Sequence, residues 1–180
     1  MFPKAHAVAY VLMAVRIAWF KLYKPILFYS AFFSVRIDQF EPEVMLGGIS
    51  KVLARKAEIE SMKKRTVKDD ELLTMYQVAI EMMRRGLIFK QVHITKSHAT
   101  DFLIEGNSLI LPFISVPGLG EAVALDIVAK REEKEFTSVS DVSDRTRINK
   151  TIFETMRNLG SFQGLKEEED ITEIGLFGFM

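Results

Sequence analysis

The sequence predicts a mainly α-helical protein that carries a small β element. Apolar residues recur at helical spacing over most of the 180 residues. Between residues 89 and 112 the pattern changes to short apolar runs around a turn, as in paired strands. Beyond that element, Pro117-Gly118-Leu119-Gly120 stands directly before another helical pattern. The fold class therefore consists of helices interrupted once by a small sheet.

The first 35 residues predict two apolar helices that meet at Pro25. Apolar residues from Val8 to Leu22 cover both faces of the first helix, which is typical of a helix buried inside something larger. Pro25 ends this helix and suits the first turn of a second one, 26–35. The charge-free runs 5–15 and 25–35 fall short of the about 20 residues that a membrane span needs. No small-residue cleavage site follows them, so neither a membrane segment nor a secretion signal is expected.

The middle of the chain predicts charged helices. One runs to about Arg65 and is weakened at Gly47-Gly48. Another is expected to be capped by Asp69 or Asp70 and closed by Gly86. Residues 51–68 contain seven basic and two acidic residues, a local net charge of +5, although the whole chain has a formal net charge of zero. Because Lys and Arg supply most nucleic-acid affinity, this neutrality argues against tight DNA binding by the chain alone.

The small β element is expected from three short runs. Residues 89–94 form one candidate strand, and residues 102–104 and 109–111 form two more around the turn 105–108. Short capped helices are then expected at 138–144 and at 150–158, the latter after the N-cap Asn149 and stopped by Gly160. Leu159-Gly160-Ser161 resembles a degenerate copy of the earlier glycine turn.

The turn Gly118-Leu119-Gly120 is the strongest candidate binding element. Glycine enters positive φ without a Cβ clash, and a helix start presents unpaired N–H groups and a partial positive charge. Such a helix-hairpin-helix element holds phosphate through backbone amides, here those of Gly118 and Gly120, with Lys130 or Arg131 assisting. A plain turn between two packed helices is the alternative.

Several chemistries are excluded by composition. The chain has no cysteine, so disulfides, thiolate nucleophiles and cysteine zinc sites are impossible, which fits a reducing cytoplasm. The three histidines, His6, His93 and His98, lack metal-ligand spacing. No metal site and no bound cofactor are expected in this chain.

Three stretches together resemble the C-terminal end of bacterial C-family replicative DNA polymerases of the PolC type. They are residues 1–10 followed by Leu22-Tyr23-Lys24-Pro25, residues 96–131, and the tail. The resemblance implies five segments. These are the end of the fingers (1–40), a helical connector (41–88), a small β connector (89–112), a tandem helix-hairpin-helix module (113–165) and a flexible acidic tail (166–180).

The family's reaction is template-directed nucleotide addition, with palm carboxylates holding two magnesium ions. No such carboxylate cluster is recognisable in this sequence, so the resemblance implies a piece of a polymerase with no catalytic residues and no polymerisation activity of its own. It places Lys4 and His6 near the incoming nucleoside triphosphate, where cations and hydrogen-bond donors suit phosphate oxygens. The alternative is that Lys4 only starts a helix and His6 packs against it.

The tail resembles the sliding-clamp-binding pentapeptide of this family, broadly Gln-Leu-x-Leu-Phe. Its apolar anchors would be Ile174, Leu176 and Phe177, while Glu173 replaces the glutamine. Packing of the tail on its own domain is the alternative. The expected partners are thus duplex DNA, a bacterial sliding clamp and the remainder of the polymerase chain, with no membrane.

Two rival functions differ in class. A free-standing helix-hairpin-helix module predicts a well-capped, monodisperse chain, whereas a polymerase piece predicts an exposed apolar N-terminal face and self-association. A repair glycosylase would need a catalytic Asp in a loop soon after the hairpin, but Asp126 falls inside the predicted helix.

Overall fold

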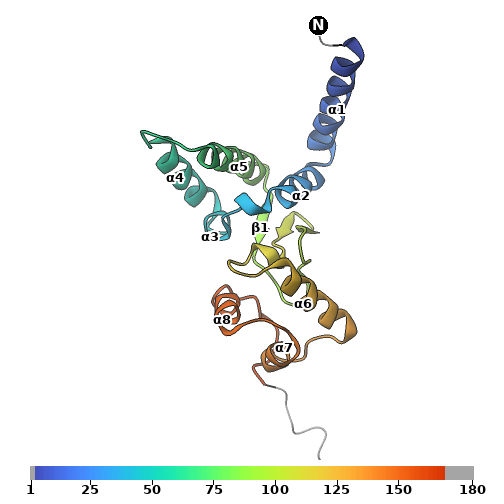
Figure 1. Cartoon of the computed structure of the whole chain (residues 1–180), viewed down its shortest axis with the longest axis vertical. Coiled ribbons are helices and arrows are strands. Elements are labelled where there is room, and N and C mark those ends of the chain that lie inside the picture. The colour runs from blue at the N-terminus through green and yellow to red at the C-terminus, as the bar shows by residue number, and fades with distance from the viewer. Residues whose placement is uncertain (1–2, 169–180) are drawn as a thin grey trace, which may run out of the picture. The chain divides into compact units, whose positions relative to one another are not determined.

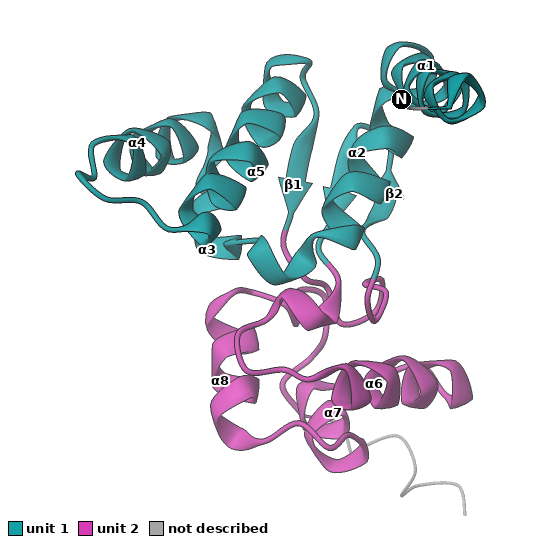
Figure 2. Ribbon diagram, turned by 45° about the horizontal axis from the view of Figure 1, so that its top comes forward, with its two compact units in different colours: residues 1–90, 101–111 teal, residues 91–100, 112–180 magenta. Residues whose placement is uncertain are grey.

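The computed structural model describes residues 3–168 and divides the chain into two compact units (Figure 2). Unit 1 comprises residues 1–90 and 101–111, and unit 2 comprises residues 91–100 and 112–180. Helices dominate both units and a single three-stranded sheet lies in unit 1, so the predicted fold class is confirmed. The five-segment division inferred from the resemblance remains a prediction.

Unit 1 begins with the two expected apolar helices, α1 (Lys4–Tyr23) and α2 (Pro25–Val35), with Pro25 in the first turn of α2 (Figure 1). No residue of α1 is buried. With 20 residues, α1 is also long and apolar enough to cross a membrane by length and composition. The charge-free runs in the sequence did not predict a helix of this length and apolar character, because Arg16 interrupts the run without ending the helix.

The next helices are η1 (Ile37–Gln39), α3 (Pro42–Met45), α4 (Gly48–Glu60) and α5 (Val67–Arg84). Gly48, at φ 77°, is the first residue of α4, and the chain leaves α3 just before the glycine pair that predicted a weak point. The predicted cap of α5 is wrong by one turn: Thr66 is the N-cap, and Asp69 is the third helical residue of a capping box. Gly86 has φ 78° and ends α5 as predicted.

The sheet contains β1 (Ile88–Lys90), β2 (Leu103–Glu105) and β3 (Ser108–Ile110) in the order β1-β3-β2. β2 and β3 form the predicted antiparallel hairpin, whereas β1 pairs with β3 in parallel. The ring centroids of Phe33 and Phe89 lie 5.0 Å apart, and so do those of Phe40 and Phe102. Aromatic packing against α2 thus forms the core of unit 1.

Unit 2 contains η2 (Phe113–Ser115), α6 (Glu121–Glu133), α7 (Val139–Arg145) and α8 (Lys150–Asn158). Ser138 and Asn149 cap α7 and α8 through their side chains. Gly160, at φ 72°, follows α8 as predicted. The second hairpin predicted at 159–161 is wrong, because no helix follows it within the described residues; the second helix pair is α7–α8, joined by residues 146–149.

Candidate nucleic-acid interface

The first hairpin lies between η2 and α6. Its turn is closed by a hydrogen bond from the Leu119 amide to the Val116 carbonyl at 3.0 Å, with Gly118 at φ 82°. Gly120 has φ −79° and is the N-cap of α6, so the expectation that it needs positive φ is wrong. The Leu119 side chain is only 4% exposed. Gly118 therefore shapes the turn, and Leu119 anchors it in unit 2.

Several backbone amides of this hairpin have no acceptor within the described protein. The carbonyl of Gly120 accepts hydrogen bonds from the amides of Val123 and Ala124, which start the helix. In the part of the chain that the structure describes, the amides of Gly118, Gly120 and Ala122 donate to no protein acceptor. Unpaired amides at a helix start attract phosphate oxygens. Glu121, in the first turn of α6, partly opposes this attraction.

Lys130 does not lie beside the first hairpin. It belongs to the last turn of α6, about 15 Å along the helix axis from Gly120 at 1.5 Å per residue. Its ammonium group also contacts the Glu133 carboxylate at 2.8 Å. The predicted assistance of Lys130 at the glycine turn is therefore not supported by its position.

Arg131 has internal partners. Its guanidinium donates to the carbonyls of Ile94, at 3.1 Å, and Ser97, at 2.9 Å, and lies over the Phe113 ring. Burial lowers the pKa of the Arg131 guanidinium. These contacts anchor α6 to the turn that precedes it in unit 2, and contact of Arg131 with DNA stays a prediction.

The second hairpin, residues 146–149 between α7 and α8, contains no glycine. The Arg147 amide donates to the Asp126 carboxylate at 3.0 Å, while the Arg147 side chain is 85% exposed. The Asn149 side chain accepts from the Ile152 amide at 2.9 Å and caps α8. Lys150 is exposed, and the first turn of α8 has no acidic residue. This hairpin thus adds positive charge to a capped helix start.

Sequence reasoning missed the second hairpin because it searched for glycine. A usable signal was present: two short capped helices separated by four residues, with Arg147 and Lys150 at the junction.

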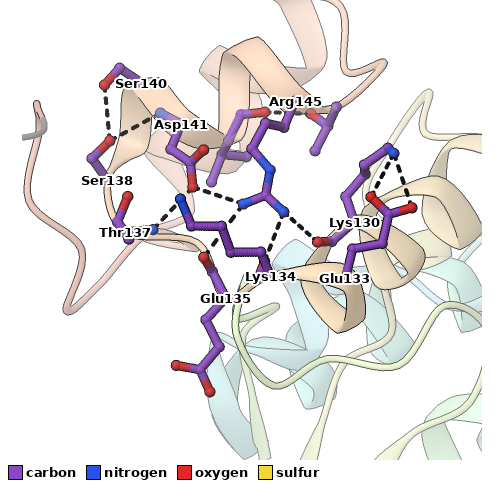
Figure 3. A network of polar contacts seen from close by, with 11 residues as sticks. Lys130, Glu133, Lys134, Glu135, Thr137, Ser138, Ser140, Asp141 and Arg145 are labelled. Carbon is purple, nitrogen blue, oxygen red and sulfur yellow. Dashed lines mark hydrogen bonds and ion pairs between the residues drawn. The ribbon is translucent and has the colours of Figure 1, made fainter.

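Arg145 holds the two helix pairs of unit 2 together (Figure 3). Its guanidinium donates to the carbonyls of Lys130 and Lys134 at the end of α6, at 2.5 Å and 2.8 Å. It also pairs with the Asp141 carboxylate at 2.9 Å and covers the Phe136 ring. The guanidinium thereby adds a second donor to the Lys130 carbonyl, which already accepts from the Lys134 amide, and a donor to the Lys134 carbonyl just beyond the helix end.

The remaining predicted site residues lie elsewhere. Lys4 begins α1, and the His6 ring meets the Tyr10 ring edge-on at 4.5 Å, both in unit 1. The clamp-binding residues Glu173, Ile174, Leu176 and Phe177 lie outside the described residues. Residues 3–168 include no group of three or more His, Asp or Glu side chains that could hold a metal ion.

The family model of the helix-hairpin-helix motif matches residues 86–171, which contain both hairpins of unit 2. Three proteins similar to this chain are each a DNA polymerase III of the PolC type. The Oceanobacillus iheyensis protein is 48% identical over 98% of this chain, the Thermotoga maritima protein 46% over 96%, and the Bacillus subtilis protein 44% over 96%. The resemblance to PolC-type polymerases is confirmed along nearly the whole chain, which spans only 12–13% of the length of these relatives.

Proposed function

We propose that unit 2 binds the phosphate backbone of duplex DNA as part of a PolC-type replicative polymerase. The observation that carries this proposal is the first hairpin, where Gly118 takes φ 82° and the amides of Gly118, Gly120 and Ala122 have no acceptor within the described protein. Its place inside a segment that matches the helix-hairpin-helix family supports a DNA ligand.

The two hairpins would contribute different interactions. The first offers backbone amides and a helix dipole, and the second adds the exposed cations Arg147 and Lys150. Both kinds of contact position a duplex without reading its sequence. The zero formal net charge predicts weak, salt-sensitive binding by the isolated chain.

In this proposal, nucleotide addition and its magnesium ions belong to polymerase segments other than this chain. Lys4 and His6 are proposed to lie near the incoming nucleotide in the assembled polymerase. Lys4→Ala in a full-length polymerase should raise the apparent KM for nucleotide. An unchanged KM would remove that role, and nucleotide incorporation by the 180-residue chain alone would overturn its proposed inactivity.

We further propose that the tail tethers the polymerase to a bacterial sliding clamp. Ile174, Leu176 and Phe177 supply apolar anchors in a short motif, a common form of peptide recognition. Glu173 introduces a charge where the family pattern has glutamine. Chromosomal DNA and the clamp would place this work in the cytoplasm.

The deciding experiment measures binding of the intact chain, and of a version that ends at Glu169, to primed duplex DNA and to a bacterial sliding clamp. Duplex binding by both versions, with clamp binding by the intact chain alone, is the expected result. Absence of duplex binding at low salt would overturn the hairpin proposal. Clamp binding that survives truncation would overturn the role of the tail.

A free-standing helix-hairpin-helix module remains the alternative. The exposure of α1 on all sides favours the polymerase piece, because a self-sufficient module would bury such an apolar helix. Light scattering separates the two: concentration-dependent association indicates the polymerase piece, and a monodisperse monomer indicates the module.

A further inference from the structure

The loop between α4 and α5 is the most strongly charged exposed feature of unit 1. We call residues 61–68, which lead from α4 into the start of α5 (Figure 1), the α4–α5 tip. Every residue of the tip is exposed. The tip contains four basic residues and no acidic one: Lys63, Lys64, Arg65 and Lys68. The two hairpins of unit 2 do not involve this charge.

The acidic residues beside the tip are already engaged. Glu58 pairs with Arg55 at 2.7 Å, and Glu60 pairs with Lys56 at 2.6 Å. Asp70 pairs with Arg65 at 3.2 Å. In the described chain, by contrast, the three lysine ammonium groups of the tip have no partner. The tip therefore presents three lysine ammonium groups that form no ion pair in the described chain: Lys63, Lys64 and Lys68.

The backbone of the tip is well fixed. The Asp69 carboxylate accepts from the Thr66 amide at 2.7 Å and from the Thr66 hydroxyl at 2.8 Å, and the hydrogen bond from the backbone amide lowers the pKa of Asp69. The Tyr76 hydroxyl donates to Glu41, which also faces Arg55 and so ties α4 to α5. Because α5 has 18 residues, it holds the tip about 27 Å from its own other end.

We propose that the α4–α5 tip is a second contact with the phosphate backbone of the DNA. This inference rests on the proposed function, since it assumes that the chain works on DNA. Lysine ammonium groups are compact, hydrated point charges that bind phosphate without base specificity. The phosphates of a DNA strand follow one another every few ångströms, so three lysines within six residues of one another can each contact a phosphate.

The test compares two triple variants of the 180-residue chain by fluorescence anisotropy with primed duplex DNA across a salt series. The first variant is K63A/K64A/K68A. The matched control removes the same charge from exposed positions of unit 1 and is R16A/K24A/R84A. We expect the tip variant to bind about tenfold more weakly and to lower the salt slope by roughly two to three, at about 0.9 per phosphate contact. The control should change both quantities far less.

A proximity measurement makes the result independent of affinity. The chain lacks cysteine, so Lys64→Cys can carry a single iron chelate that cleaves nearby DNA. Backbone cleavage from this position, and none from a label at Arg84→Cys, is the expected outcome.

The two proposals fail in distinguishable ways. If Gly118→Ala weakens binding while the tip variant matches its control, the tip proposal is overturned and the hairpin proposal stands. If the tip variant loses binding while Gly118→Ala does not, the hairpin proposal fails instead. A third outcome concerns membranes. If the chain binds phosphatidylglycerol vesicles only when the tip lysines are present, and the label at position 64 cleaves no DNA, the tip contacts a membrane surface and the proposed DNA contact is overturned.

Discussion

The two hairpins of unit 2 present helix starts in different ways. The first depends on backbone conformation: Gly118 takes φ 82°, and Leu119 is buried beneath the turn. The second needs no glycine and relies on side chains, with Asn149 capping α8 and Arg147 extending outward. The first helix start carries an acidic residue, Glu121, and the second carries none.

In the proposed function, the first hairpin would bind phosphate through backbone geometry and the second through charge. A turn that exposes backbone amides needs no cation beside it, whereas a turn without glycine can compensate with Arg and Lys. The first hairpin should thus be sensitive to substitutions that alter φ, and the second to substitutions that alter charge. Four predictions test that separation, in order of decreasing effect.

The largest effect is expected at Arg145, on which both hairpins depend. Arg145→Ala leaves the carbonyls of Lys130 and Lys134 without their cationic donor and should lower the free energy of unfolding by about 2–3 kcal/mol. Urea denaturation measures this loss. Arg145→Lys, which keeps the charge but not the forked geometry, should recover only part of it. A wild-type midpoint for Arg145→Ala would show that unit 2 does not rely on this network.

Gly118→Ala should lower the free energy of unfolding by about 1–2 kcal/mol, because an L-residue is strained at positive φ. Space is not the cause, since a Cβ at this position would meet only Ile152 Cγ1 at 3.9 Å. Gly120→Ala is the matched control: its φ is −79° and its Cβ would have nothing within 4 Å. DNA binding should weaken for Gly118→Ala with every duplex sequence. Equal losses in the two variants would contradict a turn built on Gly118 alone.

Asn149→Ala should lower stability by about 1 kcal/mol, since the amide of Ile152 loses its acceptor. Asn149→Gly should lower the free energy of unfolding by only a few tenths of a kcal/mol, because glycine is tolerated at an N-cap. Thermal unfolding of both variants gives the difference. If they prove equally stable, the side-chain cap does not define the second hairpin.

The smallest effect on stability belongs to Arg147. Its side chain is 85% exposed and its ion pair with the largely buried Asp126 is long, at 3.7 Å, so Arg147→Ala should change the free energy of unfolding by less than about 0.5 kcal/mol. Its effect should appear in DNA binding, as a salt slope lower by roughly one. An unchanged slope would remove Arg147 from the interface and leave the second hairpin without its proposed charge contact.

Local signals predicted much of the fold. Pro25 begins α2, Gly86 follows α5, and Asn149 caps α8, each through interactions within a few residues of the chain. The cap of α5 was misplaced because Asp69 and Thr66 both suit a helix start, and only their reciprocal hydrogen bonds identify which is the N-cap.

The candidate site was predicted less completely. Gly118 was found because positive φ is a local requirement that few residues meet. Arg131 looked like a DNA contact in the sequence, yet its guanidinium binds the Ile94 and Ser97 carbonyls, which lie more than thirty residues away. The second hairpin was predicted at 159–161 instead of 146–149, because the glycine in Leu159-Gly160-Ser161 was followed and the junction of two short capped helices at 146–149 was not.

The sequence by itself determined the start of α2, the end of α5 and the cap of α8, and its motifs carry the similarity to PolC-type polymerases. Those properties depend on neighbouring residues or on the order of residues alone. Tertiary structure decided that β1 joins β3 in parallel, that Arg145 caps α6 from α7, and that the α4–α5 tip keeps unpaired lysines. These outcomes depend on which distant groups packing brings within hydrogen-bonding distance, and no local pattern encodes that choice.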